Sequence, residues 1–154
     1  DEEVRGYMQK LSETGTYTVS DRVLRAVQAE FSCGFCTDAQ GAQTIGKTFR
    51  ESRYLLDTHT AVACTVLGAY RAETGDQTLT VVESTASPFK FCASVLDALG
   101  VTEHAPGTGV LGQLTAETGR PAPTPLASLA GKPVRFDQVT DRGDMRAVVT
   151  EFLR

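Results

Sequence analysis

The stretch TLTVVESTASPFKFCASVLDALG, residues 78–100, contains the clearest structural unit of the chain. Residues 78–82 are β-prone and follow a Gly-Asp turn, which is typical of a strand. Ser87-Pro88 supplies an N-cap residue followed by proline at the first helical position, and an apolar stripe then continues to Gly100. The stretch therefore predicts a strand, a tight loop and a helix.

Further helices are predicted on both sides of this unit from N-cap residues and from apolar residues at helical spacing. They cover residues 4–14, 20–31, 37–53, 57–70 and 145–152. Thr37 and Gln40 form a T-x-x-Q capping box for the third of these helices. The fourth, for which Asp57 is the expected cap, is apolar on much of its surface, so we expect it to be buried.

The predicted fold class is α/β: a helix-rich layered domain with a small, partly incomplete sheet. Residues 100–125 hold five glycines and four prolines and are expected to be a Gly/Pro-rich loop with at most a weak helix over 110–117. Residues 132–136 fit a short edge strand. One or two strands cannot satisfy their own backbone groups. Their partners are therefore expected in a longer chain, of which this sequence, beginning at Asp1, would be a piece.

Composition favours one soluble domain over residues 1–154. Of these residues, 41% are hydrophobic and 22% are charged, and the formal net charge is −4. Basic residues are scattered, which argues against nucleic acid or an anionic membrane as partners. No apolar run approaches the roughly 20 residues that span a bilayer, and no leader is recognisable, so a cytoplasmic location is expected.

Several motifs carry weak signals for chemistry. Residues 107–112 match G-x-G-x-x-G but lack the preceding strand that gives this pattern its phosphate-binding role. Cys33 and Cys36 form a C-x-x-C without a second pair, so no metal site is predicted. Cys64 and Cys92 fit core positions. His59 begins a helix without a second histidine or a nucleophile elbow nearby, which favours a packing or capping role.

The loop at residues 84–88 is more informative. Small hydroxyl side chains follow the predicted strand, and the carboxyl ends of strands in an open α/β sheet line the usual ligand crevice. The same hydroxyls could instead only cap the next helix. From the residues alone, both interpretations stay open.

Two segments together resemble threonine synthase. Residues 54–62, YLLDTHTAV, are similar to the family's GYLLDPHTAV stretch, and residues 84–91, STASPFKF, are similar to its STASPYKF stretch. The order and separation of the two segments also fit that family. Its members are fold-type II enzymes that use pyridoxal phosphate (PLP).

The resemblance implies the C-terminal portion of a lyase of threonine biosynthesis, which converts O-phosphohomoserine and water to threonine and phosphate. The cofactor supplies the electron sink for this chemistry. The resemblance also implies that Thr85, and with it Ser84, lies beside the cofactor ring. Asp57 and His59 correspond to a structural helix start, and no catalytic residue is assigned to this chain.

Departures from the family pattern limit what this chain is expected to do alone. The family's Schiff-base lysine and glycine-rich phosphate loop have no counterpart here, and Lys90 stands in the wrong motif to replace that lysine. Thr58 replaces the usual proline before His59. We therefore expect no covalently bound PLP and no turnover by the isolated chain, with the missing N-terminal catalytic region as its partner.

Two rival hypotheses belong to other classes. A non-catalytic ligand-binding or regulatory module derived from the same fold predicts weak saturable binding without chemistry. A thiol-redox protein built on Cys33 and Cys36 predicts a lowered thiol pKa and loss of activity in Cys33→Ser. Apolar surface and strand edges left open by excision also predict self-association.

Overall fold

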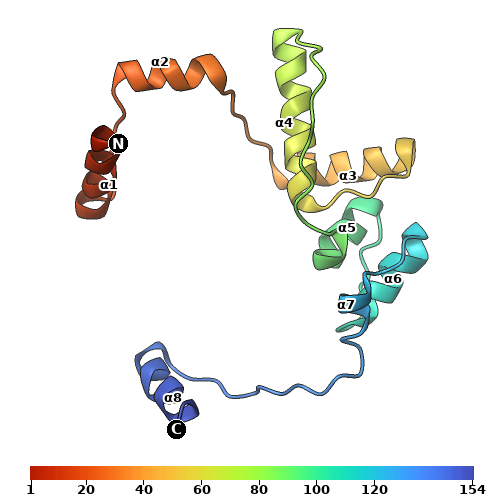
Figure 1. Ribbon diagram of the computed structural model, residues 1–154. Helices are drawn as coiled ribbons and strands as arrows, with labels where there is room; N and C mark the ends of the chain where they lie inside the picture. The colour runs from red at the N-terminus through yellow and green to blue at the C-terminus, as the bar shows by residue number, and fades with distance from the viewer.

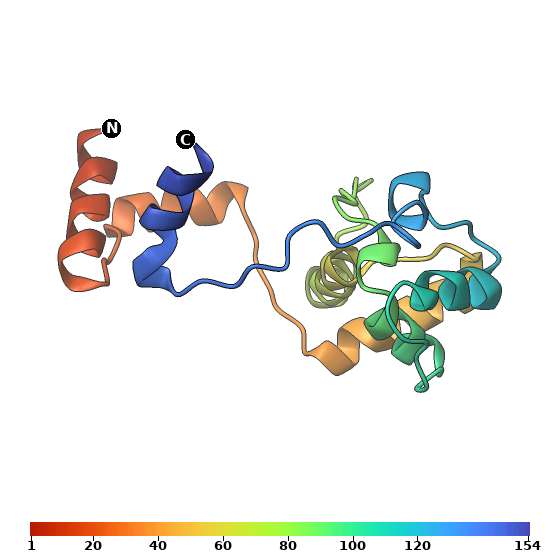
Figure 2. The same ribbon diagram turned by 90° about the horizontal axis from the view of Figure 1, so that it is seen from below.

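The computed structural model describes residues 1–154 and is built from helices alone. A body of packed helices carries other helices, near the two ends of the chain, that extend away from it in both views (Figures 1 and 2). The elements are α1 (Glu2–Thr14), α2 (Asp21–Glu30), α3 (Asp38–Ser52), α4 (Thr58–Thr74), η1 (Pro88–Lys90), α5 (Cys92–Leu99), α6 (Gly109–Thr118), α7 (Thr124–Ala127), η2 (Arg142–Asp144) and α8 (Met145–Phe152). None of these helices is both long and apolar enough to cross a membrane.

The predicted helix caps are confirmed. Thr37 Oγ1 accepts from the Gln40 N–H at 3.3 Å, and Gln40 Oε1 accepts from the Thr37 N–H at 2.8 Å, so the capping box of α3 is complete. Ser20 caps α2, and Asp57 caps α4. These bonds satisfy amide groups that the first turn of each helix leaves without a partner.

The core lies where α3, α4, α5 and α6 meet. Its buried apolar side chains are Ile45, Leu56, Ala61, Phe89, Cys92, Val95, Leu96 and Leu114. Gly46 allows α3 to approach α5 closely, because a Cβ atom at this position would lie 2.6 Å from the carbonyl oxygen of Ala98.

The two predicted strands are not formed. Residues 78–82 and 132–136 belong to no helix or strand, and Leu79 and Val134 are 93% and 83% exposed. A strand needs a neighbour to accept and donate its backbone hydrogen bonds, and the chain supplies none here. The sheet of the predicted fold class is therefore unconfirmed, whereas the helix-rich character is confirmed.

The helix predicted to start at Ser87-Pro88 is divided in two. Ser87 Oγ accepts from the Phe89 N–H at 3.3 Å and caps the short helix η1 instead. Phe91 then leaves the helical conformation, with φ −130° and ψ 38°, and α5 begins at Cys92. The break turns Phe89 into the core, where its side chain is 6% exposed.

Residues 100–125 were expected to be a loop with at most a weak helix over 110–117, and the structure has the ten-residue helix α6 there. The prediction that α4 is a buried helix is wrong for this chain, because only Thr60 and Ala61 are buried within it. Cys64, Val66 and Leu67 are half-buried, and Val62 and Ala63 are exposed.

The chain as a whole exposes far more surface than a compact domain. Its accessible surface is 12,090 Å², whereas a compact monomer of this size is expected to expose about 7,600 Å². Helices α1 and α2 touch through polar contacts, including an ion pair of Glu3 with Arg22. Apolar side chains on α1, α2 and α8 remain exposed, among them Val4, Leu24 and Phe152.

Candidate functional site

The N-cap of α4 is built around a buried carboxylate. Asp57 is 1% exposed, and its Oδ1 accepts from the backbone N–H groups of His59 at 2.9 Å and Thr60 at 3.3 Å. Its Oδ2 accepts from the Thr60 hydroxyl. Burial raises the pKa of Asp57, but these hydrogen bonds outweigh it and hold the pKa below the usual value. The residue is therefore ionised and fixed in place near neutral pH.

Ser84 joins this network from a distant part of the chain. Its Oγ lies 3.0 Å from Thr60 Oγ1 and 3.5 Å from Asp57 Oδ2. The loop that follows the extended segment is thereby tied to the start of α4. The carboxylate was predictable as a cap, but its contact with Ser84 was missed, since no local pattern marks a partner 27 residues away.

Thr85 and Ser84 are both exposed residues, but they differ in their hydrogen bonds. The hydroxyl of Thr85 has no hydrogen-bond partner within the chain. Ser87, two residues later, is occupied as the cap of η1. The structure therefore brings Ser84 against Asp57 and leaves Thr85 free to contact another group.

The two histidines occupy different surroundings. The ring of His59 packs against the ring of Phe91, with centroids 5.0 Å apart, and its Nδ1 lies 3.4 Å from Asp57 Oδ1. His104, which the sequence places only in a loop, has its Nε2 3.0 Å from Asp97 Oδ1. The hydroxyl nearest to either ring is that of the adjacent Thr58, whose Oγ1 lies 3.4 Å from His59 Nδ1.

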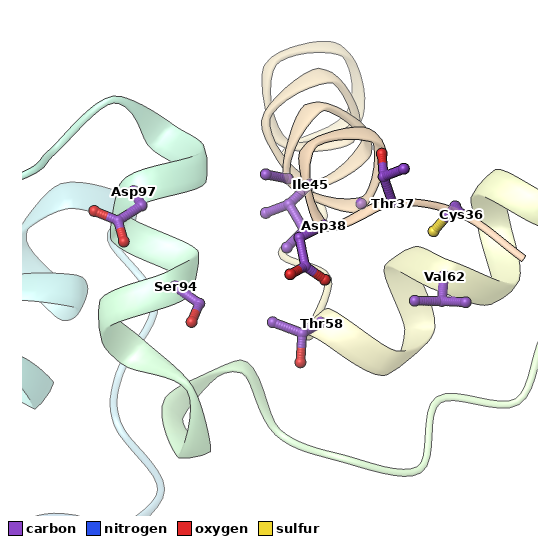
Figure 3. Close-up of a pocket in the computed structure, with 10 residues that line it drawn as sticks. Cys36, Thr37, Asp38, Ile45, Thr58, Val62, Ser94 and Asp97 are labelled. Atoms are coloured by element: carbon purple, nitrogen blue, oxygen red, sulfur yellow. The ribbon is translucent and has the colours of Figure 1, made fainter.

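A pocket of about 390 Å³ opens between α3, α4 and α5 (Figure 3). Ser94 and Asp97 of α5 lie across it from Asp38 and Thr58, and Cys36 and Val62 line its other end. Neither Ser84 nor Thr85 lines this pocket. Its lining mixes two carboxylates with hydroxyl and apolar side chains.

The remaining motifs of the sequence form no further candidate site. Cys33 is exposed, Cys36 is half-buried, and both are free thiols in the α2–α3 linker. No group of three or more metal-ligating side chains exists in the structure. Gly107–Gly112 falls on the turn into α6 and its first residues. Burial raises the thiol pKa of Cys64 and Cys92, which fits core positions.

A family model described as "Threonine synthase, C-terminal" matches residues 60–150. The curated human protein "Threonine synthase-like 1" is 27% identical over 94 residues, which are 61% of this chain and 12% of that protein. Its mouse counterpart is 33% identical over 82 residues, which are 53% of this chain and 10% of that protein.

A solved structure is also similar to the chain. It is the PLP-bound threonine synthase from Brucella melitensis, with 35% sequence identity and a TM-score of 0.57. The match covers 77% of this chain and 24% of that enzyme. The chain thus spans about a quarter of the solved relative and about a tenth of the curated ones.

Proposed function

Because the chain belongs to the family of threonine synthase C-terminal domains, we propose that it is part of an enzyme that converts O-phosphohomoserine and water to threonine and phosphate. The observation that carries the proposal is the 35% identity to a PLP-bound threonine synthase over 77% of the chain. The rest of that enzyme, about three quarters of its length, has no counterpart here. The reaction therefore belongs to a longer protein, which we expect to be cytoplasmic.

The cofactor of the proposed longer enzyme is PLP, which acts as an electron sink when bound. Within this chain, Thr85 fits a contact with the pyridine ring, because its neutral hydroxyl is exposed and has no internal partner. Such a hydroxyl can donate to or accept from a ring nitrogen without adding charge. Ser84 is engaged by Asp57 and Thr60, so its proposed part is to hold the backbone of Thr85 in position.

The isolated chain is proposed to be inactive. Its four lysines, at positions 10, 47, 90 and 132, are all exposed, and none stands in a buried pocket that could hold a cofactor on it. Titration of the purified chain with PLP, followed by borohydride reduction and peptide mapping, is expected to give no adduct specific to one lysine. A specific adduct on Lys90 or another lysine would contradict this.

The activity of the parent is tested in a fusion in which this chain replaces the matching quarter of the Brucella melitensis enzyme. We expect phosphate release from O-phosphohomoserine, and we expect Thr85→Val to lower kcat by about 10- to 100-fold, as for loss of one hydrogen bond to a desolvated partner. Thr102→Val, at another exposed threonine, serves as the matched control. A folded fusion with bound PLP and no turnover would refute the proposal.

A second candidate is a non-catalytic ligand-binding or regulatory module. The pocket of about 390 Å³ favours it, because this pocket does not contain the proposed cofactor residues. The curated relatives are named threonine synthase-like. Saturable binding of O-phosphohomoserine or threonine to the isolated chain, abolished by Ser94→Trp in the pocket, would support this candidate, and its absence would exclude it.

A further inference from the structure

Another pocket, of about 310 Å³, lies where three distant segments of the chain meet. Its lining comes from residues 54–55, residues 87–89 and the link between α6 and α7. The first two segments belong to the two stretches that resemble threonine synthase. Neither Ser84 nor Thr85 lines this pocket, so it is distinct from the candidate cofactor loop.

Arg120 brings a fixed positive charge to this pocket. Its guanidinium donates to the carbonyl oxygen of Arg53 at 2.8 Å, across 67 residues of sequence. Arg53 ends α3 in the left-handed conformation, with φ 57°, and no other residue except glycine has a positive φ. A guanidinium has five N–H groups, and this bond uses one of them. The remaining N–H groups of Arg120 can therefore bind a ligand.

The charge of Arg120 is not neutralised within the chain. No acidic side chain lines the pocket, and Arg120 takes part in no ion pair. The neighbouring cation, Arg53, lies over the ring of Phe49, 4.2 Å from its centroid. The pocket between α3, α4 and α5 differs in this respect, because two carboxylates line it. A concave site with positive charge alone attracts anions.

Hydroxyl groups add neutral donors to the lining. Ser87 Oγ accepts from the Phe89 N–H at 3.3 Å, which leaves its own O–H free to donate. Tyr54 is 53% exposed, and its hydroxyl has no hydrogen-bond partner within the chain. Leu55 and Pro88 contribute apolar surface. Such a lining fits a ligand with an anionic head and a short apolar body.

We propose that this pocket binds a small phosphate-bearing anion, either inorganic phosphate or a phosphate monoester, through Arg120. Arginine can bind two phosphate oxygens at once, and a phosphate presents more acceptor oxygens than a carboxylate to the surrounding hydroxyls. The volume of about 310 Å³ is near the lower end for small-molecule sites, about 300–1,000 Å³. The inference does not depend on the proposed reaction, since the site needs no PLP.

A bound anion would connect the three segments that line the pocket. Because it would bind the folded chain and not the unfolded one, it should raise the Tm. Ser87 lies two residues after Thr85, so an occupied pocket would also restrict the loop that carries the candidate cofactor residue.

Titration of the isotope-labelled chain with inorganic phosphate, followed by NMR at constant ionic strength, tests the proposal. We expect saturable shifts of the amide signals of Tyr54, Ser87 and Phe89. Arg120→Gln is expected to raise the Kd at least about 10-fold, as for loss of a hydrogen bond to a charged group. Arg142→Gln removes the same charge outside this pocket and should leave the Kd unchanged.

Two results of this titration would overturn the proposal. Shifts that do not saturate would mean that the pocket has no defined site. An equal rise in Kd for both substitutions would mean that the net charge of the chain, and not this pocket, attracts the anion.

Further variants separate binding from folding, because Arg120→Gln also removes the bond to Arg53. Tyr54→Phe removes only a hydroxyl and is expected to raise the Kd about 3- to 10-fold without changing the Tm measured in the absence of phosphate. Arg120→Lys keeps the charge without the planar fork, so an intermediate Kd is expected. A Kd unchanged in both variants would reduce Arg120 to a structural contact and overturn the site.

Different probes identify the ligand. Tighter binding of O-phosphohomoserine than of inorganic phosphate would support a phosphate monoester, and the reverse order would support the free ion. Threonine, which has a carboxylate and no phosphate, is expected to shift none of these signals. Equal binding of threonine would overturn the phosphate assignment. Binding that survives Arg120→Gln and is lost in Ser94→Trp would place the ligand in the pocket between α3, α4 and α5 instead.

The fusion with the Brucella melitensis enzyme tests the site in a longer protein. Phosphate binding that depends on Arg120 is expected there as well. Binding in the isolated chain that is absent from a folded fusion would mean that the remainder of the enzyme fills the pocket, and would overturn the site for that protein. Turnover without such binding would refute only the site, and binding without turnover would refute only the proposed reaction.

Discussion

At the scale of single residues, the most consequential group is the buried carboxylate of Asp57. It closes the first turn of α4 and binds Ser84 from the next segment. One side chain therefore joins two parts of the chain that carry the family-like motifs. Its pKa is lowered although the residue is buried, because these donors outweigh the effect of burial.

Replacement of Asp57 by asparagine is expected to reduce the free energy of unfolding by about 1–3 kcal/mol at pH 7, because a charged acceptor of several hydrogen bonds is lost. The folded-state pKa is lowered, so the stabilisation is present above the unfolded pKa, near 4, and is lost as pH falls through the folded value. Urea unfolding at pH 7 and pH 3 measures this. The difference between wild type and Asp57→Asn should shrink at pH 3.

The control for this experiment is Glu117→Gln, at an exposed position of α6, which should change stability by less than about 0.5 kcal/mol. An equal loss for Asp57→Asn at both pH values would mean that its charge does not contribute, and that the effect comes from altered shape alone.

At the scale of elements, the sequence correctly predicted the features that depend on interactions between residues close together in the chain. The caps Ser20, Thr37 and Asp57 were predictable because each bonds an amide two or three residues away. The strand predicted at 78–82 is not formed and α4 is not buried as predicted. Both features need neighbouring segments that this chain lacks. The break at Phe91 was missed because no glycine or proline stands at or beside this residue to mark it.

The contrast between a core helix and the extended segment can be measured with one type of substitution. Leu96 of α5 is 0% exposed, and Leu79 is 93% exposed. In the isolated chain, Leu96→Ala is expected to cost about 2–5 kcal/mol through lost burial and the cavity left behind. Leu79→Ala should cost less than about 0.5 kcal/mol. Chemical unfolding followed by far-UV circular dichroism compares the two, and similar losses would show that the segment packs within the isolated chain.

At the scale of the whole molecule, the chain is a helical body with extensions. Its accessible surface of 12,090 Å² and the exposed apolar faces of α1, α2 and α8 leave much apolar surface uncovered within this chain. The family membership and the motifs of the candidate site were predictable from two short segments. The placement of the extensions was not predictable, since local sequence patterns do not specify how distant helices are arranged.

Limited proteolysis should reveal this organisation. The exposed connection between α7 and α8 contains Arg135, whereas Lys132 is followed by proline, at which trypsin does not cut. Within the connection between α7 and α8, we expect trypsin to cut first after Arg135. Sites in α3 and α4 are expected to be cut later. Mass spectrometry of a time course, with Arg135→Gln as control, identifies the order. Early cleavage after Lys47 or Arg71 would show that the body is not formed.

The close contact between α3 and α5 restricts which sequences natural variation can reach. Any side chain at position 46 would strike the carbonyl oxygen of Ala98, whereas Gly68 and Gly112 have open space around them. A Cβ atom therefore has room at the latter two positions and not at the first. In related sequences, replacement of Gly46 is expected to occur together with a second substitution that lets α5 move outward.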